Sequence, residues 1–300
     1  MQRIVVIAGP TGSGKTALAI ALAQRVGGEV VNADSQQVYR GLDVGTAKPT
    51  AAERAAAPHH LLDLVEPGEG MDAARFVSLA DAAIAGIAAR GRVAIVAGGT
   101  GLYVRALLHG VVEAPGRDPA LRARLEDEAA RLGRPALHAR LAAVDPAAAA
   151  RIGPNDLVRI VRALEIAASG RTQSERFAAH AFQEDRYDAL LVALAPAREE
   201  LHRRIDARVV EMFHAGVLDE ARSLVARFGA VLPTKLPIGY PEAAACVRGE
   251  LPLAEAIRRV QVAHRRYARR QVIWLRREPG VEWLAPPPDV DALARRVEMR

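Results

Sequence analysis

The sequence predicts an α/β fold in which helices flank a parallel sheet and a small all-helical domain interrupts the chain. Three apolar runs, at residues 4–8, 30–33 and 92–97, have the length and composition of buried strands. Residues 72–90 show helical periodicity, and a further strand-like run occupies residues 187–194. Strands that alternate with helices are typical of a parallel sheet that is covered on both faces.

A long helical stretch, residues 118–169, separates the third predicted strand from the fourth. Helix-breaking residues interrupt it at Gly133-Arg134-Pro135, Pro146 and Gly153-Pro154. The run Pro286-Pro287-Pro288 is interpreted as a spacer before a final helix. We therefore expect three segments: a first part of the core at residues 1–114, a helical insertion at residues 115–185, and a resumed core at residues 186–300.

The segment after the first predicted strand fits the P-loop pattern G-x-x-x-x-G-K-[ST], and residues 17–23 after it favour a helix. Glycines let such a loop wrap a diphosphate, so that backbone N–H groups and a helix N-terminus point at its oxygens. Lys15 adds a cation, and the Thr16 hydroxyl is placed to ligate Mg²⁺. The pattern predicts a P-loop NTPase-like core. Its expected diphosphate-binding residues are Gly9, Pro10, Thr11, Gly12, Ser13, Gly14, Lys15 and Thr16.

Polar residues follow the second and third predicted strands, at the sheet edge where parallel α/β folds bind ligands. Asp34 could hold Mg²⁺ through water, accept a proton from a nucleophile, or cap a turn. In Gly98-Gly99-Thr100-Gly101, small residues would let a ligand approach the backbone, and Thr100 could donate a hydrogen bond. The third strand ends without the aspartate of a Walker B element, which argues against an NTPase or kinase.

The composition points to a polyanionic partner and excludes several classes of protein. The formal net charge is +6, although arginine makes up nearly all of the basic residues, as a GC-rich genome would favour. No apolar run approaches the ~18 residues of a membrane span, and we expect no cleaved leader, because the sequence goes straight into the first predicted strand. Cys246 is alone, so a disulfide framework is excluded, and His59-His60 lacks a third metal ligand. We expect a cytoplasmic protein, and nothing suggests an obligate interface.

The C-terminal residues 258–277 contain eight arginines and no acidic residue. Arg265 and Arg269 are four residues apart, as are Arg266 and Arg270, so like charges would stack on one helix face at a repulsive cost. Contact with nucleic-acid phosphates would offset that repulsion. Tyr267 and Trp274 lie in the same stretch and could stack on bases or pack in the core. The run favours an RNA-facing element over a merely solvated face.

With these residues in view, the chain resembles the bacterial tRNA dimethylallyltransferases, the tRNA isopentenyltransferase family, nearly from end to end. Several ordered motifs carry the resemblance and together are more specific than any one of them: residues 9–16, 32–35, 43–49, 58–61, 98–103, 154–156, 159–165, 204–208, 238–240 and 269–276. One departure is the pair Pro237 and Pro241, where the family usually carries other residues.

The resemblance implies transfer of a dimethylallyl group from dimethylallyl diphosphate to N6 of adenosine 37, beside the tRNA anticodon, with Mg²⁺ as cofactor. It implies Asp34 as the base, with Lys15, Arg208 and Thr100 as the other catalytic residues. The tRNA anticodon stem-loop would be held by the insertion, by the C-terminal stretch and by residues of the motifs. The implied tRNA contacts are Asp34, Ser35, Gln36, Gln37, Thr100, Arg159, Arg162, Gly239, Tyr240, Arg269, Arg270, Gln271, Trp274 and Arg276.

Three alternatives stay open at the level of sequence. A P-loop small-molecule kinase would transfer a phosphoryl group and would not need the basic C-terminus. A noncatalytic RNA-binding factor would use the P-loop as a nucleotide switch. A third protein class keeps the prenyl chemistry but uses free adenine nucleotide; the helical insertion and the arginine run argue for tRNA instead.

Overall fold

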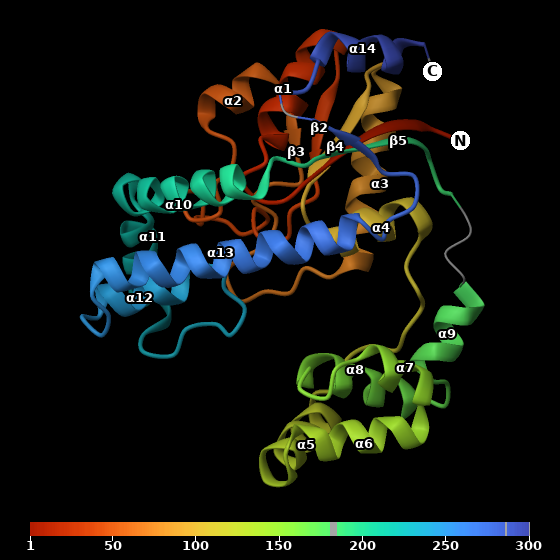
Figure 1. The fold of residues 1–300 in the computed structure, drawn as a ribbon, viewed down its shortest axis with the longest axis vertical. Coiled ribbons are helices and arrows are strands. Elements are labelled where there is room, and N and C mark those ends of the chain that lie inside the picture. The colour runs from red at the N-terminus through yellow and green to blue at the C-terminus, as the bar shows by residue number, and fades with distance from the viewer. Residues whose placement is uncertain (181–184, 286, 300) are drawn as a thin grey trace. The chain divides into compact units, whose positions relative to one another are not determined.

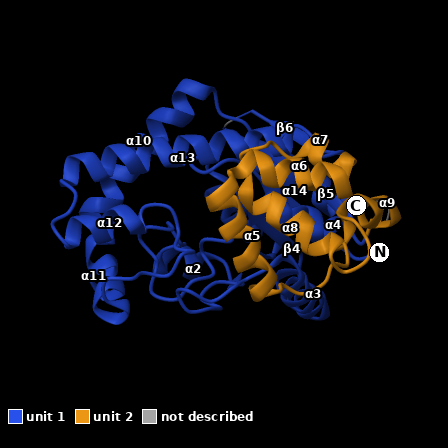
Figure 2. Ribbon diagram, turned by 90° about the horizontal axis from the view of Figure 1, so that it is seen from below, with its two compact units in different colours: residues 1–108, 186–300 blue, residues 109–185 orange. Residues whose placement is uncertain are grey.

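The computed structural model describes residues 1–180, 185–285 and 287–299. The chain forms two compact units, Met1–Leu108 with Arg186–Arg300, and His109–Asp185 (Figures 1 and 2). The second unit therefore begins at His109, whereas the sequence placed the start of the insertion at residue 115. Of the expected proline spacer, Pro286 lies outside the described residues.

The first unit contains a six-stranded parallel sheet with the order β3-β2-β4-β1-β5-β6. Its strands are β1 Arg3–Ala8, β2 Glu29–Asn32, β3 His59–His60, β4 Ala94–Gly98, β5 Asp188–Leu194 and β6 Glu282–Leu284. Strand β5 follows the insertion and pairs with β1 in the register Ile7↔Val192. The predicted α/β fold with a parallel sheet is confirmed. The two edge strands β3 and β6, with two and three residues, are too short to show a pattern in the sequence.

Helices flank this sheet, and apolar side chains from both elements form the core. Helix α1 (Lys15–Val26) buries Leu18 and Leu22 against Ile7 and Ile95 of the sheet. Asp72 precedes helix α3 (Ala73–Ala89), and its carboxylate accepts a hydrogen bond from the backbone N–H of Arg75 and so caps the helix. The chain also forms α2 Ala51–Ala56, α4 Gly101–His109 and α14 Val290–Glu298.

A second apolar cluster lies among the helices that follow β5. The helices are α10 Arg198–Ala215, α11 Val217–Phe228, α12 Tyr240–Val247 and α13 Leu253–Leu275. Their cluster includes Phe213, Leu224, Tyr240 and Val260. The long helix α13 runs beside α10 (Figure 1), where Gln261 donates a hydrogen bond to the backbone carbonyl of Asp206 (3.1 Å). This arrangement brings the C-terminal arginine-rich helix next to the P-loop side of the unit.

The second unit is helical in its described part. It holds α5 Pro119–Leu132, α6 Arg134–Val144, α7 Pro146–Arg151, α8 Leu157–Ala167 and α9 Gln173–His180. The breaks that glycine and proline predict fall between these helices, because proline fits the first turn of a helix but not its interior. Asp145 connects two of them: its carboxylate accepts hydrogen bonds from the backbone N–H groups of Ala148 (2.9 Å) and Ser174 (3.0 Å). Across the described residues of both units, no helix is long and apolar enough to cross a membrane.

Candidate active site

The predicted P-loop joins β1 to α1 as a tight turn at the N-terminus of the helix. Gly12 and Gly14 adopt positive φ angles of 80° and 91°, a backbone conformation that favours glycine. The backbone N–H of Ser13 donates to the carbonyl of Pro10 (3.2 Å), and α1 begins directly after Gly14, at Lys15. Because N–H groups at a helix start carry partial positive charge, this turn can form a cradle for phosphate groups.

Lys15 brings an ammonium group to this cradle. Its Nζ lies 3.3 Å from the carbonyl oxygen of Pro10. Burial lowers the pKa of Lys15 to about 8; the charge of Asp34 opposes this shift and the charge of Arg208 adds to it. An anionic diphosphate in the cradle would favour the charged form again.

This pKa predicts that diphosphate binding weakens in alkaline solution. In the free protein, Lys15 loses its proton as the pH rises through about 8, and a neutral amine attracts a diphosphate less than an ammonium does. We expect the affinity for inorganic diphosphate to fall in that range, relative to a Lys15→Arg variant whose guanidinium stays charged. Calorimetric titration measures the diphosphate affinity of both proteins at each pH. The ratio of the two affinities removes the effect of the ligand's own protonation. A ratio that is constant to about pH 9 would contradict the role of Lys15.

Arg208 reaches the same cradle from α10. Its Nη1 donates to the hydroxyl of Thr11 over 3.3 Å. Burial lowers the pKa of its guanidinium, and the carboxylates of Asp34 and Glu53 oppose that shift. The structure thus brings together two predicted cations, from segments nearly two hundred residues apart, at one end of the site.

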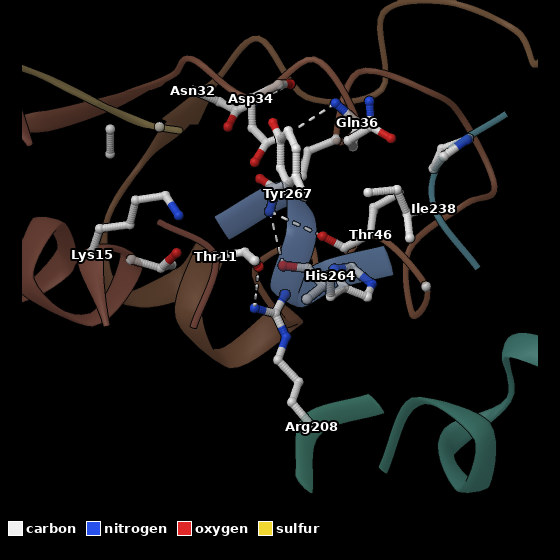
Figure 3. A pocket seen from close by; sticks show the side chains of 17 residues that line it. Thr11, Lys15, Asn32, Asp34, Gln36, Thr46, Arg208, Ile238, His264 and Tyr267 are labelled. Carbon is white, nitrogen blue, oxygen red and sulfur yellow. Dashed lines mark hydrogen bonds between the residues drawn. The ribbon is translucent and has the colours of Figure 1, made fainter. Parts of the chain in front are cut away.

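Asp34 follows β2 and is held by contacts on both sides. The backbone N–H of Gln36 donates to Asp34 Oδ1 (2.9 Å). The Asn32 side chain donates to the carbonyl oxygens of Leu61 (3.2 Å) and Asp34 (3.4 Å). These contacts fix the turn, so that the carboxylate faces the pocket with Lys15 and Tyr267 (Figure 3).

Thr100 connects the loop after β4 to the loop after β2. Its Oγ1 accepts a hydrogen bond from the backbone N–H of Ser35 (2.9 Å) and donates to the Ser35 hydroxyl (3.1 Å). Ser35 in turn accepts a hydrogen bond from the side chain of Gln36 (3.4 Å). The predicted residues Thr100, Ser35 and Gln36 therefore form one hydrogen-bonded chain beside Asp34.

One pocket collects most of these groups (Figure 3). Its lining combines the P-loop, the loops after β2 and β4, and side chains from α10 and α13: Thr11, Lys15, Thr16, Asn32, Asp34, Gln36, Gln37, Gly45, Thr46, Ala47, Ala97, Gly98, Arg208, Pro237, Ile238, His264 and Tyr267. A second cavity shares Lys15, Thr16, Ala47 and Arg208 with the first and continues along Thr50 and Met212. The P-loop residues Lys15 and Thr16 thus line two neighbouring hollows of the first unit.

His264 was not among the residues expected from the sequence. Burial, together with the charge of Arg208, lowers the pKa of His264 to about 4, so the imidazole is neutral at physiological pH. Tyr267 follows three residues later and faces the same pocket, and burial and the charge of Asp34 raise the pKa of its hydroxyl. The signal for His264 was its three-residue spacing from Tyr267, which puts both on one face of a helix.

Two predicted tRNA contacts are buried and hold a loop of the site. Tyr240 is 0% exposed; its hydroxyl donates to Glu220 (2.6 Å), and its ring leaves no room for a side chain on Gly45. Gln37 is 9% exposed and donates to the carbonyl oxygen of Ala47 (2.9 Å). The prediction that the Tyr240 side chain contacts tRNA is corrected, because it has no free surface to offer, whereas Gln37 still lines the pocket.

Glu220 and Lys48 hold that same loop. The carboxylate of Glu220 accepts hydrogen bonds from the backbone N–H groups of Asp43 (2.7 Å) and Val44 (2.8 Å). Lys48 is buried, and its Nζ donates to the carboxylates of Asp43 and Asp63, each over 2.5 Å. Lys48 is therefore a structural cation, and the motif at residues 43–49 shapes one wall of the pocket.

The arginine run on α13 is divided between internal pairs and an exposed face. Arg265 binds Asp206 of α10 (2.5 and 2.6 Å), and Arg258 and Arg259 bind Glu255 of the same helix. Within the described part of the chain, five arginines on α13 and just after it are exposed and make no ion pair: Arg266, Arg269, Arg270, Arg276 and Arg277. The expectation that Arg265 faces RNA is corrected, since Asp206 neutralises it.

The other predicted contacts are spread over both units. Gly239 directly precedes α12, has a positive φ of 102° and carries no side chain. Trp274 packs on Gly101, and Gln271 is buried. In the second unit, Arg159 is 72% exposed and forms an ion pair with Asp156 (3.5 Å), while Arg162 donates to the carbonyl of Pro115 (2.8 Å) and lies near Glu165. Arg159 thus presents a surface cation, and Arg162 is largely engaged within the insertion.

Comparison with known proteins gives one consistent result. The IPP transferase family model matches residues 37–278. The tRNA dimethylallyltransferase of Anaeromyxobacter sp. (strain K) is 83% identical over 296 residues, which cover 99% of this chain and 97% of that protein. The full-length tRNA isopentenylpyrophosphate transferase from Bacillus halodurans matches with a TM-score of 0.70 and 38% identity, covering 100% of this chain and 95% of that one.

A eukaryotic dimethylallyltransferase solved acting on tRNA gives a TM-score of 0.76 at 30% identity, covering 95% of this chain and 74% of that one. The family model covers more than half of the chain, and the similar proteins match it over nearly its whole length. The chain belongs to the IPP transferase family, whose similar members are tRNA dimethylallyltransferases.

Proposed function

We propose that this protein transfers the dimethylallyl group of dimethylallyl diphosphate to N6 of adenosine 37 in tRNA and releases diphosphate. The observation that carries the proposal is one pocket with Lys15 and Arg208 at the P-loop and Asp34 beside them. The cations suit a leaving diphosphate, and the carboxylate suits the proton of a nucleophile. A kinase would need a carboxylate at the end of β4, where Gly98 and Gly99 stand instead.

In this reaction the allylic C–O bond breaks and a C–N bond forms. Negative charge grows on the departing diphosphate, where the loop N–H groups, Lys15 and Arg208 stabilise it. The adenine amine is a weak nucleophile, because its lone pair is delocalised into the purine. Asp34 accepts the proton from N6 as the C–N bond forms. The base must leave its stack to reach the pocket, as in other enzymes that modify bases.

The same proposal includes Mg²⁺, with Thr16 as its protein ligand. Among the residues that the structure describes, no group of three or more His, Cys, Asp or Glu side chains could hold a metal ion. Mg²⁺ at a phosphate site takes most of its ligands from substrate oxygens and water and only one or two from protein. One hydroxyl beside a diphosphate cradle fits that requirement. The ion would neutralise part of the leaving-group charge.

We propose that the tRNA anticodon stem-loop binds both to the exposed arginines of α13 and to the helical insertion. We propose that the protein acts as a monomer. A tRNA substrate supports a cytoplasmic location. The five exposed arginines without ion pairs provide the positive surface that phosphates require.

Replacing Arg266, Arg269 and Arg270 together with glutamine should weaken tRNA binding and flatten its salt dependence. Each lost phosphate contact lowers the slope of log K against log salt by about 0.9 at most. Filter binding at several salt concentrations measures the slope. The matched control replaces Arg258 and Arg259, which are already paired with Glu255. An equal slope in the triple variant and the wild type would place these arginines away from RNA.

A competition assay tests the substrate. The protein is incubated with Mg²⁺, labelled dimethylallyl diphosphate, unmodified tRNA containing A36-A37-A38, AMP and ATP. Label in tRNA supports the proposal. Label in AMP would move the assignment to free nucleotide, and consumption of ATP without any prenylated product would favour the kinase.

A further inference from the structure

Gln271 is buried on α13 where this helix meets two loops of the site. It is 5% exposed. The backbone N–H of Thr11 donates to Gln271 Oε1 (2.8 Å), and Gln271 Nε2 donates to the carbonyl oxygen of Gly99 (2.9 Å). One side-chain amide therefore joins the P-loop to the loop that carries Thr100.

The glycines of the Thr100 loop give independent evidence for this docking. A Cβ built on Gly99 would lie 2.1 Å from Gln271 Nε2, and one on Gly101 would lie 2.2 Å from the Trp274 ring. A Cβ on Gly98 would clash with the backbone of Ala33. These glycines make room for α13 and for the neighbouring loop, whereas the sequence suggested that they make room for a ligand.

We propose that Gln271 is a positioning residue of the transfer reaction, which holds the P-loop against the Thr100 loop and does not contact tRNA. The inference rests on the proposed function. It explains how the diphosphate side of that site is held in a fixed position relative to the adenine side. Thr11, which Gln271 holds through its N–H, carries the hydroxyl that contacts Arg208 (3.3 Å). Displacing Thr11 would therefore displace a cation of the leaving-group site.

A glutamine suits this role because its amide both donates and accepts at a fixed spacing. Methionine has a similar length but would leave the Thr11 N–H and the Gly99 carbonyl without partners. A glutamate would still accept from Thr11, but its ionised form would repel the Gly99 carbonyl. Only a protonated glutamate offers one donor and one acceptor, as the amide does.

The first test compares Gln271→Met with Arg269→Gln, which changes an exposed arginine on the same helix. For Gln271→Met we expect kcat/KM for dimethylallyl diphosphate to fall by about tenfold or more, with an unchanged Kd for tRNA. For Arg269→Gln we expect a higher Kd for tRNA and an unchanged KM for dimethylallyl diphosphate. A loss of tRNA affinity in Gln271→Met, with unchanged use of dimethylallyl diphosphate, would overturn the proposal in favour of an RNA contact.

The second test uses pH and does not depend on how far Gln271→Met is destabilised. The activity of Gln271→Glu relative to wild type should rise as the pH is lowered from about 8 to about 6, while the same ratio for Gln271→Met stays constant. A constant ratio for Gln271→Glu would overturn the proposal.

A third measurement separates this inference from the proposed function. Binding of inorganic diphosphate with Mg²⁺ can be titrated without any turnover, and Gln271→Met should weaken it. Gly99→Ala should have the same effect, and the two losses should not add, because the new Cβ already displaces the amide. Wild-type protein that binds diphosphate but prenylates nothing would refute the proposed function alone; additive losses would refute the role of Gln271.

Discussion

Replacing Asp34 with asparagine is expected to lower kcat for prenyl transfer by on the order of a hundredfold or more, with near-normal tRNA affinity. Asparagine keeps the shape of the side chain, and its Oδ1 can still accept the hydrogen bond from Gln36 that Asp34 now accepts at 2.9 Å. It cannot take a proton from the adenine amine. Single-turnover measurement of labelled tRNA, with both substrates saturating, isolates this step.

The alanine variant separates the two roles of the carboxylate. Asp34→Ala loses both the proton acceptor and the contact with Gln36, so it should be at least as slow as Asp34→Asn and should also disturb the turn. Near wild-type turnover in Asp34→Asn would remove Asp34 from the role of base and leave it as a turn residue.

Neutralising Arg208 is expected to cause the second large loss. Arg208→Gln removes a partly buried cation next to Thr11. A charge is stabilised more strongly by a cation in a partly buried site than by one in water. We expect kcat/KM for dimethylallyl diphosphate to fall on the order of a hundredfold, with little change in the Kd for tRNA. Steady-state kinetics with varied dimethylallyl diphosphate, together with filter binding, measures both.

Arg204 supplies the matched control one turn earlier on α10. It is exposed, it donates to Glu200 (2.6 Å), and it lines a different hollow from that of Arg208. Arg204→Gln should leave kcat/KM unchanged. Equal losses in the two variants would mean that both act by disturbing α10, and the assignment of Arg208 to the leaving group would be wrong.

The sheet could be predicted from the sequence wherever a strand is long and buried. The apolar run that becomes β1, together with the P-loop and helix after it, predicts both the fold class and the sheet edge at which the pocket lies. The strand β5 could also be expected, although its pairing with β1 depends on contacts across nearly 190 residues. Strands of two or three residues, such as β3 and β6, carry too few side chains for a period to show.

Side chains that are positioned from a distance could not be predicted. The repulsion expected for Arg265 disappears because Asp206 lies on another helix, and a spacing rule along one helix does not include such a partner. The buried state of Tyr240 depends on Gly45, which is far from it in sequence. A motif names the residues that a family shares, but it does not say which of them face a ligand and which hold the site together.

The most direct test of the account localises the transferred group. Unmodified tRNA is treated with the protein, Mg²⁺ and labelled dimethylallyl diphosphate; the nucleosides are then analysed, and released diphosphate is quantified. We predict label on N6 of adenosine 37, one diphosphate released for each group transferred, and no label when guanosine replaces that adenosine. Label elsewhere in the tRNA, or release of diphosphate without transfer to adenosine 37, would contradict the account.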